Sequence, residues 1–127
     1  GVLHGIAAGL PVMKKQGFGH FINIASIGAY EVSPTAAVYC ATKYAVRAIT
    51  DGLRQETAGQ GIRVTLVSPG VTESELAESI TDNEAKEIMK EYRRTTLPAT
   101  AIAGAIVYAL EHPEYVDVSE LVIKPAI

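Results

Sequence analysis

The sequence of 127 residues has no tryptophan, a single cysteine and no long apolar run. The lone thiol, Cys40, excludes an internal disulfide and a multi-cysteine metal site, and we interpret it as a small, partly buried residue. The three histidines share no ligand spacing, so we expect no metal site. No segment approaches the roughly 20 apolar residues of a membrane span, and no charged signal-peptide region is visible. These absences predict a cytoplasmic protein without a membrane partner.

An excess of basic charge is missing as well. The net charge is −3, and the lysines and arginines form no long basic run, so we expect no nucleic-acid partner. With 48% hydrophobic and 20% charged residues, the composition is typical of one folded domain and not of a disordered chain.

What is present is an alternation of helical and strand patterns along the chain. Such an alternation is typical of an α/β fold, in which crossover helices join the strands of a parallel sheet. The predicted segments are helices over 2–16, 35–57, 73–95 and 98–111, strands over 21–25, 62–67 and 121–123, and a loop over 27–34.

Three of these segments have features that the structure can test. Pro11 lies inside helix 2–16, which predicts a kink or a late restart there. The apolar strand 21–25 is predicted to be buried on both faces. For helix 35–57, the predicted N-cap is Thr35 or Ser33. Its predicted core face consists of Val38, Ala41, Ala45, Ala48 or Ile49, and Gly52 or Leu53, and its other face of Arg47, Arg54, Gln55 and Glu56.

Tyr39 and Lys43 form the first candidate for chemistry. They are four positions apart near the start of a helix, so they lie on the same face about one turn apart. A phenol is a poor base at neutral pH, but a nearby lysine cation and the helix start both favour the phenolate. The pair can therefore act as an acid–base device. The alternative is a chance surface pair with a solvated lysine.

Ser26 is the second candidate. It follows a predicted strand, and active-site side chains collect at the carboxyl ends of parallel strands. Its hydroxyl can hydrogen-bond a substrate oxygen as charge develops there. Taken alone, Ser26 is equally well explained as a cap or turn residue. Tyr30 and Tyr44 are interpreted as packing or lining groups.

Together these residues, in the runs NIAS at 23–26, YCATK at 39–43 and SPG at 68–70, resemble the short-chain dehydrogenase/reductase family. The family's serine lies thirteen residues before its tyrosine and its lysine follows four residues later, as Ser26, Tyr39 and Lys43 do. The similarity extends over essentially all 127 residues. It implies a partial Rossmann-type parallel sheet of about three strands and is closest to bacterial broad-range reductases of small hydroxy acids and alcohols.

The resemblance implies an oxidoreductase that uses NAD or NADP to interconvert a secondary alcohol and a ketone. Tyr39 would transfer the proton, Lys43 would favour its phenolate and bind the nicotinamide ribose, and Ser26 would hold the substrate oxygen. The implied nicotinamide contacts are Pro69, Gly70, Val71, Thr72 and Ser74; Thr72 and Ser74 stand where the family has a small aliphatic residue and a threonine.

Some features of the family are not found in these 127 residues. No Gly-x-x-x-Gly-x-Gly turn follows a strand, and the family's catalytic asparagine would fall about two positions before Gly1. The chain begins without methionine inside a predicted helix. We therefore expect residues 1–127 to be the carboxy-terminal half of a single domain, unable by itself to bind dinucleotide tightly. The alternatives are a non-catalytic interaction module and a proteolytic fragment of the full enzyme.

The resemblance also implies a homo-oligomer, either a dimer or a tetramer. Helices 2–16 and 35–57 are expected to meet partner helices across the subunit interface. The loop 27–34 and the variable segment 73–95 are expected to shape the substrate pocket.

Overall fold

The computed structural model describes residues 1–72, 82–92 and 96–126. The helices and strands follow the predicted order, except that a short 3₁₀ helix forms inside the predicted loop 27–34. Most boundaries shift by a few residues, but residues 73–81 and 93–95 of the predicted helix 73–95 lie outside the described residues. In chain order the elements are α1 (Val2–Gln16), β1 (Gly19–Ile24), the short 3₁₀ helix η1 (Ile27–Ala29), α2 (Ala37–Glu56), β2 (Ile62–Pro69), α3 (Asn83–Tyr92), α4 (Ala99–Leu110) and β3 (Glu120–Ile123).

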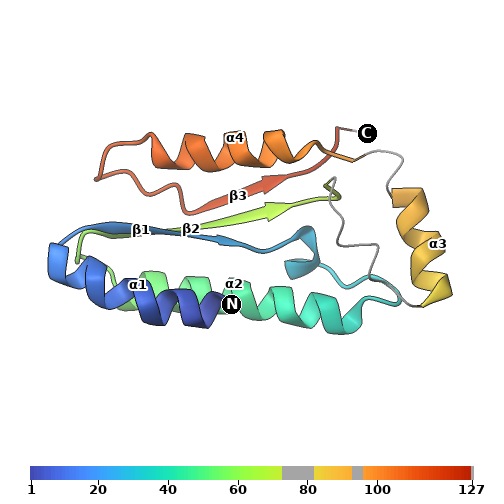
Figure 1. Ribbon diagram of the computed structural model, residues 1–127, viewed down its shortest axis with the longest axis horizontal. Coiled ribbons are helices and arrows are strands. Elements are labelled where there is room, and N and C mark those ends of the chain that lie inside the picture. The colour runs from blue at the N-terminus through green and yellow to red at the C-terminus, as the bar shows by residue number, and fades with distance from the viewer. Residues whose placement is uncertain (73–81, 93–95, 127) are drawn as a thin grey trace.

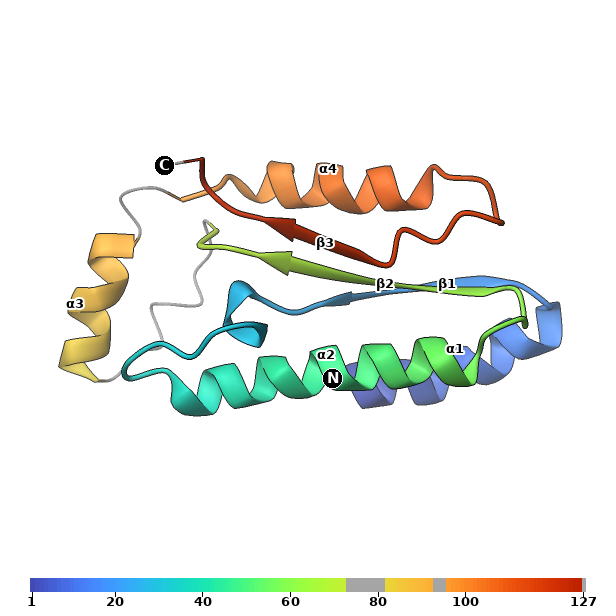
Figure 2. The ribbon, with the colours of Figure 1, turned by 180° about the vertical axis from the view of Figure 1, so that it is seen from behind.

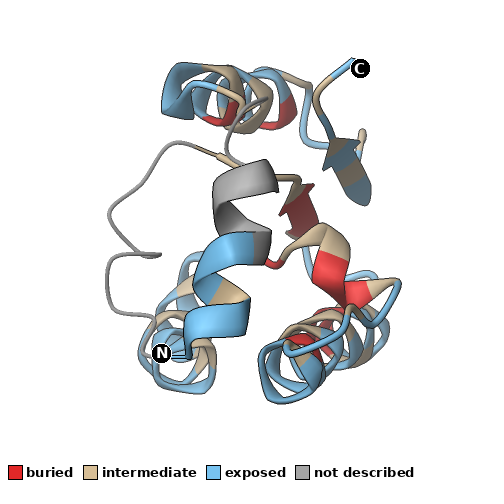
Figure 3. Ribbon diagram, turned by 90° about the vertical axis from the view of Figure 1, so that its right-hand side faces the viewer, coloured by how far each residue is buried: buried red, intermediate tan, exposed pale blue. Residues whose placement is uncertain are grey.

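The three strands form one parallel sheet in the order β1-β2-β3. Phe21 pairs with Val64 between the first two strands, and Val67 pairs with Leu121 between the last two. Helices α1 and α2 lie side by side against one face of the sheet, and α4 covers the other face (Figures 1 and 3). The predicted α/β fold with about three parallel strands is confirmed.

The principal apolar cluster lies between the sheet and the helices α1 and α2. It contains the buried residues Phe21, Leu53, Ile62 and Val64, against which Ile6, Leu10 and Met13 of α1 pack. The helix is continuous through Pro11, so the late restart considered there does not occur. Leu10 and Met13 bracket the proline and hold both halves of α1 on the sheet, which compensates for the missing backbone hydrogen bond.

The strand β1 is buried on one face only, which corrects the sequence prediction. Phe21 and Asn23 are buried, whereas Ile24, on the opposite face, is 40% exposed. The reason is the placement of α4, which packs mainly on β2. By contrast, the central strand β2 is buried on both faces from Val64 to Ser68.

The predicted core face of α2 is correct at Leu53 but wrong at most of its other positions. The buried residues of this helix are Cys40, Thr50 and Leu53, whereas Val38 is 81% exposed. The exposed stripe includes Ala41, Ala45 and Ala48. Polar groups occupy the true contact face because they find partners there: the Thr50 hydroxyl donates to the Val46 carbonyl and accepts from Asn23.

Two arginines of α2 likewise lie against the fold and not in solvent. Arg47 donates to the carbonyl oxygen of Ala29, and Arg54 donates to the carbonyl oxygens of Val64 and Ser119. Arg54 also pairs with Asp51 at 2.9 Å. Long guanidinium side chains can cross an apolar surface and still reach acceptors, which hydrophobic periodicity does not reveal.

Neither predicted cap begins α2. The N-cap residue is Ala36, without a side-chain hydrogen bond, and its amide donates to the backbone carbonyl of Ser33. Thr35 has a φ angle of 67°, in the left-handed region. The chain therefore turns into α2 through backbone bonds and one strained residue.

At the amino-terminal edge of the sheet, Gly59 and Gly61 both have left-handed backbones, with φ angles of 79° and 74°. They differ in their surroundings. A Cβ on Gly59 would meet nothing within 4 Å, whereas a Cβ on Gly61 would fall 2.5 Å from the carbonyl oxygen of Gly17. Gly61 thus serves both the turn and the close approach of two chain segments.

This pair of glycines gives a matched test. Gly59→Ala is expected to lower the free energy of unfolding by about 1–2 kcal/mol, the cost of a left-handed alanine. Gly61→Ala is expected to lower it clearly further, since its methyl group meets a backbone oxygen that cannot move freely. Urea unfolding of both variants measures the difference, and equal losses would contradict the packing role of Gly61.

A buried polar chain joins β1 to the segment before β3. The Thr65 hydroxyl donates its only hydrogen to the Val118 carbonyl at 2.7 Å. His20 Nε2 lies 2.7 Å from Thr65 Oγ1, so it must be the donor of the hydrogen bond between these two atoms. Nε2 of His20 therefore carries a hydrogen, and its Nδ1 is buried without a partner in the part of the chain that the structure describes. Burial, and then the charge of Arg63, lower the pKa of His20 from its ordinary 6.5, while Asp117 opposes the shift.

The lowered pKa predicts a pH dependence of stability. The unfolded chain takes up a proton on this histidine near pH 6.5, whereas the folded chain does so only at lower pH. The free energy of unfolding should therefore fall as the pH drops below 6.5. His20→Gln, whose amide can still donate to Thr65, should reduce that fall, and His4→Gln on the exposed start of α1 should not. Unfolding curves at several pH values that coincide for wild type and His20→Gln would refute the assignment.

Candidate active site

The chain leaves β1 at the carboxyl edge of the sheet (Figure 2), and Ser26 follows two residues after the end of this strand at Ile24. It is the N-cap of η1, and its Oγ accepts a hydrogen bond from the Gly28 amide at 3.1 Å. Its role as a cap residue is thus real. The cap does not exclude a second role, because a hydroxyl that accepts from an amide keeps its own hydrogen available for donation.

Gly28 brings the serine and the tyrosine together. A Cβ on this residue would lie 3.5 Å from Ser26 Oγ, 3.3 Å from Tyr39 Cε1 and 3.3 Å from Cys40 Sγ. Gly28 is not among the glycines with positive φ, so the backbone alone does not require glycine here. The close approach of α2 requires it instead. The hydroxyl of Ser26 and the ring of Tyr39 therefore face a common small space.

Tyr39 and Lys43 lie on the first turns of α2, as predicted. The Lys43 Nζ is 5.7 Å from the centroid of the Tyr39 ring. Tyr39 is 43% exposed and Lys43 is half-buried. Within the described ranges, no carboxylate forms an ion pair with Lys43, so its ammonium is not neutralised by the fold around it.

Arg47 and Tyr30 also belong to this region, and the sequence interpretation missed the role of the arginine. The guanidinium carbon of Arg47 lies 4.3 Å from the centroid of the Tyr30 ring, and Nη1 donates to the Ala29 carbonyl at 3.2 Å. The spacing held a usable signal: Arg47 follows Lys43 by four residues, which places both side chains on one face of α2. Tyr30 packs against the buried residues Ala25, Ala29 and Leu66, in agreement with its predicted packing role.

The segment from Pro69 to Thr72 continues β2 beyond the same edge of the sheet. Gly70 donates to the Ile123 carbonyl at 2.7 Å, and a Cβ on it would lie 3.1 Å from Pro125. The Val71 carbonyl accepts from the Leu97 amide, and the Thr72 hydroxyl donates to the Gly70 carbonyl. The predicted contact Ser74 lies outside the described residues.

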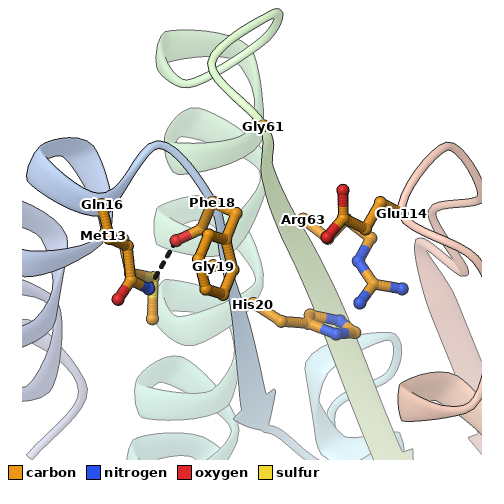
Figure 4. A pocket seen from close by; sticks show the side chains of 8 residues that line it. All are labelled: Met13, Gln16, Phe18, Gly19, His20, Gly61, Arg63 and Glu114. Atoms are coloured by element: carbon orange, nitrogen blue, oxygen red, sulfur yellow. Dashed lines mark hydrogen bonds between the residues drawn. The ribbon is translucent and has the colours of Figure 1, made fainter.

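A separate hollow of about 290 Å³ opens at the amino-terminal edge of the sheet (Figure 4). Met13 and Gln16 of α1 lie on one side of it, and His20, Arg63 and Glu114 lie on the other. It contains none of the candidate catalytic residues. The chemistry predicted from the sequence therefore belongs to the opposite edge.

Two further findings concern the described residues as a whole. No three histidine, cysteine, aspartate or glutamate side chains gather there into a possible metal site. None of the helices in residues 1–72, 82–92 and 96–126 is both long and apolar enough to cross a membrane.

Two solved dehydrogenase structures share this arrangement. The closed form of a serine dehydrogenase complexed with NADP⁺ superposes with a TM-score of 0.81 at 29% identity, covering 91% of this chain and 48% of that one. A gluconate 5-dehydrogenase of Burkholderia cenocepacia, in complex with NADP and tartrate, superposes with a TM-score of 0.75 at 29% identity. The match covers 94% of this chain and 48% of the gluconate 5-dehydrogenase.

Sequence relatives agree with the structural ones. An uncharacterized oxidoreductase of Staphylococcus saprophyticus is 50% identical over 99% of this chain and 52% of its own length. One of Staphylococcus epidermidis is 42% identical over 98% of this chain and 50% of its own length. The chain thus spans about half the length of these relatives. The family model for short chain dehydrogenase matches residues 1–85, and the chain therefore belongs to the short-chain dehydrogenase family.

Proposed function

We propose that this chain provides the proton-transfer centre of an oxidoreductase that interconverts a secondary alcohol and a ketone with NAD or NADP. The observation that supports it most is the convergence at Gly28. The Ser26 hydroxyl and the Tyr39 ring pack on this one residue, and Lys43 lies one helical turn beyond Tyr39. A hydroxyl donor, a phenol and a nearby ammonium are the groups that such a reaction needs.

The proposed roles follow from the chemistry of each group. In reduction, the Tyr39 hydroxyl gives its proton to the carbonyl oxygen, and in oxidation the phenolate takes that proton back. Ser26 donates its free hydrogen to the same oxygen, while the Gly28 amide fixes its Oγ. Lys43 stabilises negative charge on Tyr39 from one turn away. When bound, the nicotinamide supplies or accepts the hydride at the carbon.

The residues at the carboxyl edge fit such a cofactor in part. Lys43 offers ammonium donors beside Tyr39 for ribose hydroxyls, and Pro69 and Gly70 offer a small apolar surface. The Val71 carbonyl and the hydroxyl hydrogen of Thr72 already have partners within the chain. We therefore expect these two residues to contact the cofactor mainly through other backbone groups. Ser74 stays a prediction. NADP in the two superposed dehydrogenases supports the cofactor class.

The substrate proposal is a small hydroxylated acid or alcohol. The superposed enzymes are named for serine and for gluconate, which both have a secondary or primary alcohol near a carboxylate. We also propose that residues 1–127 correspond to the carboxy-terminal half of a Rossmann-type domain. The superposed dehydrogenases, of which they cover about half, support this correspondence. A cytoplasmic location stays a prediction.

We further propose a homo-oligomer. Exposed apolar side chains line the outer faces of α1 and α2, where Leu3 is 63%, Val12 60% and Val38 81% exposed. The exposed alanines of α2 would let a second helix approach closely. Residues of this kind on two adjacent helices favour a helix-to-helix contact between subunits.

Removing the Tyr39 hydroxyl tests the proposed chemistry. Tyr39→Phe, in the protein as its gene encodes it, should lower NADPH-dependent ketone reduction by about 10²- to 10⁴-fold, because a general acid is lost. Binding of NADPH, measured by fluorescence titration, should persist. Tyr44→Phe is the matched control on the same helix and should keep full activity. Retained turnover in Tyr39→Phe would refute the acid–base role, whereas an absence of turnover in the wild type would favour a non-catalytic interaction module.

Negative charge introduced at the exposed alanines of α2 tests whether this helix lies at a subunit interface. Ala41→Glu and Ala45→Glu in one chain should repel the partner helix and give a monomer by analytical ultracentrifugation, whereas wild type sediments as a dimer or tetramer. Lys86→Glu, at an exposed position on α3, is the control. Monomeric wild-type protein at high concentration would contradict the proposal.

A further inference from the structure

The position of η1 sets the gap between Ser26 and Tyr39. The Gly28 amide holds the Ser26 hydroxyl at 3.1 Å, and the missing side chain of Gly28 lets the Tyr39 ring approach to van der Waals contact. A shift of this turn by a fraction of an ångström would therefore move the serine hydroxyl relative to the phenol. What holds the turn in place thus matters for the proposed reaction.

The far end of the turn is held by Arg47. Its Nη1 donates to the carbonyl oxygen of Ala29, the last residue of η1, at 3.2 Å. Its guanidinium carbon also lies over the ring of Tyr30, 4.3 Å from the ring centroid. Immediately beyond, Glu31 and Val32 are exposed, and Val32 is 63% accessible. Arg47 therefore contacts the turn at its last buried residue, shortly before the chain becomes exposed to solvent.

Arg47 belongs to the helix that also carries the phenol and the ammonium. It follows Lys43 by four residues and Tyr39 by eight, so all three side chains project from one face of α2. Contacts consequently form a closed path from Tyr39 along α2 to Arg47, through Ala29 and Gly28, and back to Tyr39. Such a closed path resists changes in any one distance.

The chemistry of arginine suits this double contact. A planar guanidinium can stack on an aromatic ring and at the same time donate in its own plane to a carbonyl. A lysine ammonium has no plane to stack and prefers full hydration. The half-buried position of Arg47 strengthens both interactions relative to a solvated surface pair.

We propose that Arg47 is a positioning residue that fixes the Ser26 hydroxyl against Tyr39 by holding the turn 27–30 on α2. The proposal rests on the proposed function, because its effect is read out in the proton-transfer step. It assigns no contact between Arg47 and the substrate or the cofactor.

Arg54 provides a matched control. It lies on the same helix and also donates to backbone carbonyls, those of Val64 and Ser119, but it does so near the opposite edge of the sheet. Substituting Arg54 should therefore lower stability without changing the distance between Ser26 and Tyr39. The two arginines separate a loss of positioning from a loss of stability.

The test compares Arg47→Met, Arg47→Lys and Arg54→Lys in the protein as its gene encodes it, with NADPH and the ketone that wild type reduces fastest. We expect kcat to fall about 10- to 100-fold in Arg47→Met, the effect of a small misplacement of reacting groups, with an unchanged Kd for NADPH. Arg47→Lys should also be impaired. Arg54→Lys should show a lower unfolding midpoint and an unchanged kcat.

Three outcomes would overturn the proposal. They are full activity in Arg47→Met, full rescue in Arg47→Lys, which would assign the effect to charge alone, and equal losses of kcat in Arg47→Met and Arg54→Lys. Tyr30→Leu provides a second variant if Arg47→Met does not fold, and it should lower kcat because it removes the ring beneath Arg47. Full activity in Tyr39→Phe would instead refute the proposed function itself, so the two failures are distinguishable.

Discussion

The parallel pairing of β1 with β2 is the constraint on which the candidate site depends. Parallel strands must end at the same edge of a sheet, so the chain after Ile24 and the chain after Val67 emerge side by side. This places Ser26 beside Pro69 although 43 positions separate them in the sequence. The crossover helix α2 then returns across the sheet, and its first turns bring Tyr39 to the same edge.

The sequence predicted the order of elements because each has a strong local signal. The apolar residues Ile6, Leu10 and Met13 recur at helical spacing, and they are the residues through which α1 packs on the sheet. Apolar spacing placed Leu53 of α2 correctly but not the alanines of that helix, which outnumber its buried residues. Alanine favours a helix but does not indicate which face of the helix is buried. The contacts of Thr50 and Arg47 depend on Asn23 and Ala29, which lie on other segments of the chain.

The candidate site was predictable in its residue types but not in its geometry. The spacing of Ser26, Tyr39 and Lys43 was legible in the sequence, and its setting was correct. The contact through Gly28 could not be predicted, because the need for a residue without Cβ arises only when α2 packs against the turn. Nor could the hydrogen on His20 Nε2, which follows from the single hydrogen of Thr65.

The attachment of β3 has a consequence for how the molecule opens locally. This strand has only four residues, and the segment before it is held by side chains of β2 and α2. Arg63 donates a hydrogen bond to the carbonyl of His112, Thr65 to that of Val118 and Arg54 to that of Ser119. These bonds come from β2 and α2, so the segment 112–119 and β3 must leave together or not at all. Amide hydrogens there would exchange as one cooperative unit, whereas those of β2 would exchange only when the whole domain unfolds.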